Sequence, residues 1–276
     1  MDANNHFQNY LDAVGILDIS EVTAEELVKV ALTFAIWPSI STYRESPWLA
    51  PFAIRRSRVR NEPNAPGHKR DLWGLPTELG YFTDDNSLIK SLPLKKPLSP
   101  ATGPYGDSKI TKGLVCCHIW PGTTTSALLF SFVPNLVWLP KSLANFSDAH
   151  LAREPHLVHY ALRKASIDRY GLDHLNERVA RAWALLETKS HVELDIFQST
   201  EIADSGNISL LAKQRTIRLI NFLESTLIDQ AKPPNRFSKR YHAGVGPGID
   251  KSVSTVQDWL SRKTREQLID EMRECL

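Results

Sequence analysis

The chain has 276 residues, of which 42% are hydrophobic and 23% charged, which is ordinary for a globular protein of one large or two modest domains. No apolar run approaches the roughly 18 residues that a membrane helix needs, so no membrane partner is expected, and the net charge of +2 points to no class of ligand. Three cysteines, two of them adjacent, cannot form a disulfide framework and the first residues lack a secretory signal, so we expect a cytoplasmic protein.

The first helix signal lies between residues 23 and 37. Thr23 and Glu26 have the spacing of a capping box, in which each side chain satisfies a backbone N–H of the helix start. Apolar residues then recur at helical spacing until Pro38 ends the segment. Residues 38–112 are rich in proline and glycine and lack a long periodic segment, so they predict an irregular but packed N-terminal arm.

A basic segment, RRSRVRNEPNAPGHKR, occupies residues 55–70 of this arm and contains a single acid, Glu62. A solvated surface loop is one interpretation, and contact with the phosphates of a polyanion is the other. The candidate DNA-binding residues are Arg55, Arg56, Arg58, Arg60, Lys69 and Arg70.

Residues 112–150 predict the order strand, loop, strand, helix. The run LVCCHIW at 114–120 is β-prone, residues 127–133 form a second apolar run, and NLVWLP at 135–140 is a third short extended piece. The Pro-Gly-Thr stretch after the first run is typical of a turn, and a helix is expected from Pro140 onward.

The remainder of the chain predicts helices. Amphipathic patterns cover residues 154–171, 172–189 and 205–232, and a last helix is expected from about Ser254 to the end.

Cys116, Cys117 and His118 raise the question of a metal site. On a strand, Cys116 and His118 share one face and Cys117 takes the other. Structural zinc sites use pairs of ligands spaced two to four residues apart, and the third cysteine, Cys275, stands alone. A closed zinc ribbon is therefore not predicted.

His118, Asn135 within NLVWLP, and Asn145 or His150 beyond it follow one another in an order that resembles the HNH, or ββα-metal, endonucleases. The resemblance covers residues 112–152. It implies an α+β fold with a ββα-metal hairpin–helix core, an irregular N-terminal arm and a mainly helical C-terminal region. The expected domains are a DNA-contacting region 1–111, a nuclease core 112–172 and a helical region 173–276 for scaffolding, dimerisation or DNA recognition.

The resemblance also implies roles for these residues. His118 would be the general base that deprotonates a water, because the pKa of histidine suits proton transfer near neutral pH, and Asn135 would orient its ring by hydrogen bonding. Cys117, Asn145 and His150 would bind a divalent metal ion, with Mg²⁺ favoured and Mn²⁺ or Zn²⁺ as alternatives. Cys117 departs from the family, which places Asp or His there, and a thiolate suits softer ions than Mg²⁺. Cys117 is thus either a ligand or a buried core residue.

The expected function is a metal-dependent endonuclease of double-stranded DNA in restriction or phage defence, with the C-terminal helices available for a homodimer contact. A catalytically inactive nucleic-acid-binding protein and a nuclease of RNA or single strands are the alternatives. A buried, hydrogen-bonded His118 without chemistry would also account for the pattern.

Overall fold

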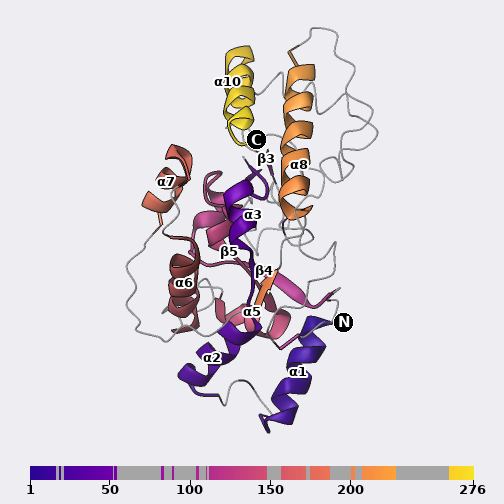
Figure 1. Ribbon diagram of the computed structural model, residues 1–276, viewed down its shortest axis with the longest axis vertical. Coiled ribbons are helices and arrows are strands. Elements are labelled where there is room, and N and C mark those ends of the chain that lie inside the picture. The colour runs from indigo at the N-terminus through magenta and orange to yellow at the C-terminus, as the bar shows by residue number, and fades with distance from the viewer. Residues whose placement is uncertain are drawn as a thin grey trace, which may run out of the picture.

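The computed structural model describes residues 1–16, 19, 22–51, 53–54, 82–83, 89, 104–105, 110, 112–147, 157–171, 175–186, 200–202, 207–227 and 261–276. Within these ranges, helices surround a small central sheet, and a separate pair of long helices extends away from it (Figure 1). The mixed helix and strand content confirms the expected α+β class.

The N-terminal region is more regular than its proline and glycine content predicts. The capping box of Thr23 and Glu26 is present, with Glu26 N–H donating to Thr23 Oγ1 over 3.2 Å. The expectation of an irregular arm over residues 38–112 is wrong for residues 40–45, which form a short helix that buries Thr42 and Tyr43, and the helix at residues 3–13 was not predicted. The elements there are α1 (Ala3–Ala13), α2 (Ala24–Phe34), β1 (Ile36–Pro38) and α3 (Ile40–Glu45).

The central sheet has the strand order β4-β5-β1-β6. Its longest pairing joins the edge strand β4 (Leu114–His118) antiparallel to β5 (Leu136–Pro140), with Leu114 opposite Pro140 and His118 opposite Leu136. Strand β1 runs antiparallel to β5 and parallel to β6 (Thr200–Ile202). The sheet thus joins strands from all three of the expected regions. A second, two-stranded sheet pairs β2 (Ala53–Ile54) with β3 (Phe82–Thr83).

Residues 112–147 have the predicted order of strand, loop, strand and helix. The loop between β4 and β5 contains two single-turn helices, η4 (Thr123–Thr125) and η5 (Val133–Asn135), and α5 (Lys141–Ser147) starts directly after β5. The prediction of an extended run at 127–133 is wrong, because Phe130 N–H turns back to donate to Ser126 O over 2.8 Å. A short apolar run that is buried in a compact turn has the same composition as a buried strand.

Apart from strand β6, the C-terminal half is helical where it is described, as predicted. Residues 254–260 of the expected last helix lie outside the described ranges, and the helix described at 262–273 has Ser261 as its N-cap. The helices are α6 (Leu157–Tyr170), α7 (Glu177–Ala184), α8 (Asn207–Ser225) and α10 (Arg262–Arg273).

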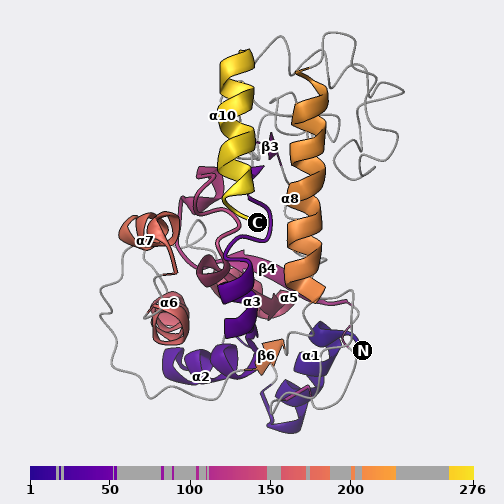
Figure 2. The same ribbon diagram turned by 45° about the horizontal axis from the view of Figure 1, so that its top comes forward.

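Two hydrophobic clusters hold the described parts together. The main cluster surrounds the sheet and includes the fully buried Trp37 of β1 and Trp138 of β5. The second, which we call the C-terminal cluster, lies between α8 and α10, which run side by side (Figure 2). None of the helices in the described ranges combines the length and the apolar character that crossing a membrane requires.

Candidate active site

His118 is the last residue of β4 and lies where the hairpin opens into the loop of residues 119–135. Its side chain is half-buried, and its ring stacks on that of Phe130 with the centroids 5.2 Å apart and the planes 21° apart. The imidazole Nε2 lies 2.9 Å from the carbonyl oxygen of Phe130. The His118 ring is therefore held both by its place at the end of β4 and by its contacts with Phe130 in the loop.

This contact determines the neutral tautomer of His118. A backbone carbonyl can only accept a hydrogen bond, so Nε2 must carry the proton and donate it to Phe130 O. In the neutral ring the lone pair that can take up a proton is then on Nδ1. A histidine with one nitrogen bonded to a fixed carbonyl has the arrangement that orients a basic nitrogen in many enzymes and metal sites.

Asn135, the last residue of η5, is completely buried and bonds the loop at three points. Its Oδ1 accepts from Trp120 N–H over 3.0 Å, and its Nδ2 donates to Thr123 Oγ1 over 2.9 Å and to Leu129 O over 2.8 Å. The expected hydrogen bond from Asn135 to the imidazole is a wrong prediction, since its amide atoms bond these three loop groups. Asn135 acts on the shape of the loop that holds His118.

Four consecutive carbonyl groups of the loop, at residues 128–131, are each held by a different donor. Such a run of bonded carbonyls fixes the loop backbone much as a strand partner would, although residues 128–131 form no strand. In chain order the bonds are Trp48 Nε1 to Leu128 O at 2.8 Å, Asn135 Nδ2 to Leu129 O at 2.8 Å, His118 Nε2 to Phe130 O at 2.9 Å, and Leu49 N to Ser131 O at 3.0 Å.

Two of these donors, Trp48 and Leu49, come from the N-terminal region. The Trp48 ring also packs against Phe132 with the centroids 5.5 Å apart, and Val133 N–H donates to Pro47 O over 2.8 Å. Residues 47–49 therefore form an outer support for the His118 loop. Sequence reasoning missed this support and missed Thr123, because no local pattern ties an isolated indole or hydroxyl to a distant carbonyl.

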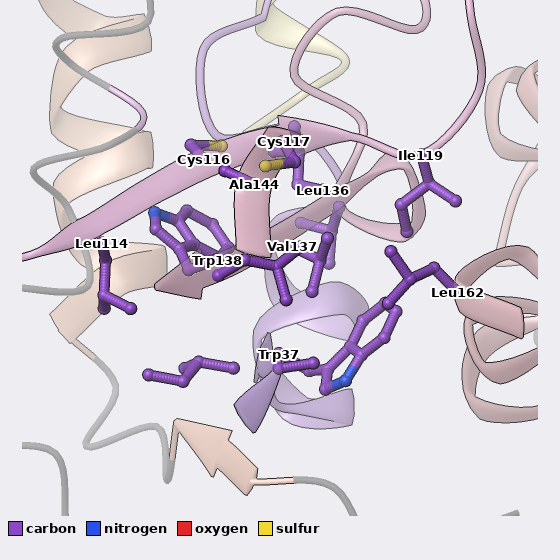
Figure 3. Packing of buried hydrophobic residues seen from close by; sticks show 14 of the residues in the cluster. Trp37, Leu114, Cys116, Cys117, Ile119, Leu136, Val137, Trp138, Ala144 and Leu162 are labelled. Carbon is purple, nitrogen blue, oxygen red and sulfur yellow. The ribbon is translucent and has the colours of Figure 1, made fainter. Parts of the chain in front are cut away.

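Cys116 and Cys117 are core residues of the described structure, with 5% and 8% of their surface exposed. Figure 3 shows both sulfur atoms among the apolar side chains of the main cluster. Cys117 pairs with Val137 in the sheet, and its Sγ lies 3.7 Å from Val115 O. The thiol environment is apolar, which favours the interpretation of Cys117 as a core residue.

The other predicted ligands are placed only in part. Asn145 lies within α5, which follows β5 directly, but its side chain is outside the described set, as is His150. Among the side chains that the structure does describe, no three His, Cys, Asp or Glu residues gather in a way that could hold a metal ion. The predicted DNA-binding residues Arg55 to Arg70 also lie outside the described ranges.

Comparisons of the chain with protein-family models, with curated proteins and with solved structures give no match.

Proposed function

We propose that the chain is a metal-dependent endonuclease that hydrolyses phosphodiester bonds of double-stranded DNA, with His118 as the general base. The observation that carries the proposal is the bond between His118 Nε2 and Phe130 O, at the mouth of a hairpin that a helix follows directly. The bond from Nε2 to Phe130 O orients the half-buried ring of His118. A ring held in this way is suited to take a proton from a water molecule through Nδ1.

In the proposed reaction, Nδ1 of His118 accepts the proton of the attacking water while Nε2 keeps its bond to the Phe130 carbonyl. The imidazolium that forms retains this bond, and the carbonyl dipole stabilises its positive charge. The buried Asn135 keeps the loop, and with it the carbonyl, in place during the proton transfer. A positioned base of this kind typically accelerates a reaction by about 10²–10⁴-fold.

The resemblance to ββα-metal endonucleases implies a divalent ion beside this base. When bound, Mg²⁺ supplies Lewis-acid stabilisation of charge on the scissile phosphate. The carboxamide oxygen of Asn145 is a donor of the hard type that Mg²⁺ prefers, whereas the buried thiol of Cys117 does not fit it. We therefore assign Asn145 and His150 to the metal and Cys117 to the core.

The partner that we propose is double-stranded DNA, with the six cations of residues 55–70 beside the active site as phosphate contacts. In the sequence, this basic segment begins a few positions after residues 47–49, which support the His118 loop, and this proximity along the chain favours the assignment. A restriction or phage-defence role follows from the large scaffold around a small nuclease unit. A homodimer through the C-terminal helices would allow both strands to be cut.

The test is cleavage of supercoiled plasmid by the purified chain with Mg²⁺, Mn²⁺ or Zn²⁺ and with EDTA, together with the same series on RNA and on single-stranded DNA. We expect nicking or linearisation of the plasmid that needs the metal and stops in EDTA. Binding of plasmid without cutting in every metal would favour the inactive nucleic-acid-binding protein, and cutting of RNA or single strands alone would reassign the substrate.

A further inference from the structure

Thr123 is a buried residue of the loop that holds His118, and its hydroxyl makes two hydrogen bonds there. It is the first residue of η4, follows Gly122 in the left-handed conformation with φ of 73°, and has 6% of its surface exposed. Its hydroxyl lies 2.6 Å from Trp120 O and 2.9 Å from Asn135 Nδ2. Both neighbours are buried, so the hydroxyl is enclosed between them.

The Thr123 hydroxyl, together with Leu129 O and Trp120 N–H, determines which way the Asn135 amide faces. A hydroxyl carries one hydrogen, and Trp120 O, which can only accept, takes it. The side of the Thr123 oxygen toward Asn135 therefore presents a lone pair, which requires an N–H and not a carbonyl oxygen. This selects the orientation in which Nδ2 faces Thr123 and also reaches Leu129 O, while Oδ1 faces Trp120 N–H.

The opposite orientation of the amide would break the support of the base. It would place an oxygen against the lone pair of Thr123 and against the carbonyl of Leu129, and an NH₂ group against the N–H of Trp120. The buried N–H of Trp120 would lose its acceptor, and Leu129 O would keep only the bond from Phe132 N–H at 3.3 Å, so the flip is costly. Leu129 immediately precedes Phe130, so loss of the shorter of the two bonds at Leu129 O loosens the peptide that leads into the carbonyl bonded by His118.

We infer that Thr123 is a positioning residue for the His118 base, acting through Asn135 and the Leu129–Phe130 backbone; the inference rests on the proposed function for its kinetic consequence. Thr123 does not itself touch the reacting atoms. Its hydroxyl fixes the amide, the amide fixes Leu129, and the next carbonyl fixes Nε2 of His118.

The first test compares Thr123→Val, which keeps the side-chain shape without the hydroxyl, with Thr123→Ser, which keeps the hydroxyl. Plasmid cleavage by Thr123→Val should show a kcat about 10- to 100-fold below wild type, because small misplacements of a catalytic group have effects of this size. The KM for DNA should stay within about twofold, because the DNA contacts are elsewhere. Thr123→Ser should restore kcat. Thr124→Val, one residue along and half-buried, is the matched control and should behave as wild type.

The second test does not depend on cleavage. The ¹⁵N chemical shifts of the His118 ring at high pH should report protonated Nε2 in the wild type and in Thr123→Ser, and a mixture of tautomers in Thr123→Val. Should Thr123→Val not fold, Thr123→Cys replaces it, because its thiol is a weak donor and acceptor and predicts an intermediate kcat and tautomer ratio.

A wild-type kcat and an unchanged ring tautomer in Thr123→Val would overturn the inference, as would a Thr123→Ser variant as impaired as Thr123→Val. Cleavage that survives replacement of His118 would overturn the proposed function instead, and the ring tautomers would still decide the role of Thr123.

Discussion

At the scale of single residues, His118 and Asn135 are the positions that the sequence identified and that the structure brings into one loop system. The contact that links them could not be predicted. The target of a carboxamide depends on the path of the loop around it, and in this chain the path brings Trp120, Thr123 and Leu129 to Asn135. The partner of His118 is a backbone carbonyl, which carries no signal in the sequence.

Cys117 is the residue on which the sequence left two interpretations open. Its 8% exposure and its place in the main cluster give it the environment of a core thiol. The alternation along β4 also directs Cys117 and His118 to opposite faces. Cys117, the position that differs from the HNH pattern, is thus packed within the main cluster.

We predict that Cys117→Ala lowers the free energy of unfolding by about 1 kcal/mol, because a buried sulfur is removed and a small cavity remains. The metal concentration that gives half-maximal plasmid cleavage should not change. Cys116→Ala is the matched control, since Cys116 is adjacent, equally buried and on the face of His118. A tenfold higher metal requirement in Cys117→Ala alone would show that the thiol binds the ion.

At the scale of elements, the starts of α1, β4 and α5 meet in one junction. Asp2 caps α1 by accepting from Asn4 N–H over 3.0 Å, while Ala3 N–H donates to Lys112 O over 2.9 Å. Asn4 Oδ1 in turn accepts from Ser142 N–H of α5 over 2.8 Å. The N-terminal helix is thereby attached to the hairpin and the helix of the candidate site.

Gly113 makes this junction possible. It has a φ of +88°, and a Cβ there would lie 2.1 Å from Asp2 Oδ1 and 2.6 Å from the backbone nitrogen of Asn4. Only glycine lets the start of α1 approach β4 this closely without strain.

We predict that Gly113→Ala is strongly destabilising, whereas Gly122→Ala is not. Both glycines have positive φ, which costs an alanine about 1–2 kcal/mol, but a Cβ at Gly122 meets no atom within 4 Å. The loss in unfolding free energy for Gly113→Ala, measured by denaturant titration, should exceed that for Gly122→Ala by about 2 kcal/mol or more. Equal losses in the two variants would mean that α1 can move away from β4 without cost.

The sequence predicted helices best where a local signal marks the start of the helix or a periodic apolar pattern runs along it. The capping box of α2 and the helices of the C-terminal half were recognised. Helix α1 was not, because its buried stripe consists only of Ala3, Phe7 and Leu11 in an otherwise polar segment. The prediction of an extended run at residues 127–133 is wrong because these residues bury their apolar side chains within a turn, which has the same composition as a buried strand.

At the scale of the whole molecule, the central sheet takes its strands from distant parts of the chain. Strand β1 inserts between β5 and β6, and residues 47–49 support the loop after β4. Pairings of such long sequence separation depend on the total packing of the core and leave no periodic pattern. This explains why the sequence predicts a separate nuclease core at residues 112–172, whereas the described sheet also contains a strand of the N-terminal region.

The C-terminal cluster is a separate packing unit. Met272 is fully buried between α8 and α10, in a cluster that shares no residue with the main one, while Ile208 at the start of α8 belongs to the main cluster. Helix α8 thus begins in the main cluster and continues into the C-terminal cluster, where it packs against α10 (Figure 1).

We predict that Met272→Ala loosens the α8–α10 pair while the sheet keeps its protection. Loss of a buried methionine typically costs about 2–5 kcal/mol, and two separate clusters can open separately. Hydrogen exchange should accelerate in the second half of α8 and in α10 and remain slow in β4 and β5. Leu139→Ala, in the main cluster, is the control and should accelerate exchange in the sheet. Equal acceleration of β4 and β5 in Met272→Ala would contradict the separation.

We propose His118 as the general base for cleavage of DNA. The most direct measurement compares the rate of metal-dependent plasmid cleavage by wild type, His118→Ala and His118→Gln, with the DNA affinity of each protein measured alongside. Glutamine can still donate to the Phe130 carbonyl but cannot take up a proton, so it preserves the loop without the base. We predict that both variants bind DNA as wild type does and cleave it about 10²–10⁴-fold more slowly. Cleavage at the wild-type rate by His118→Ala would contradict the claim.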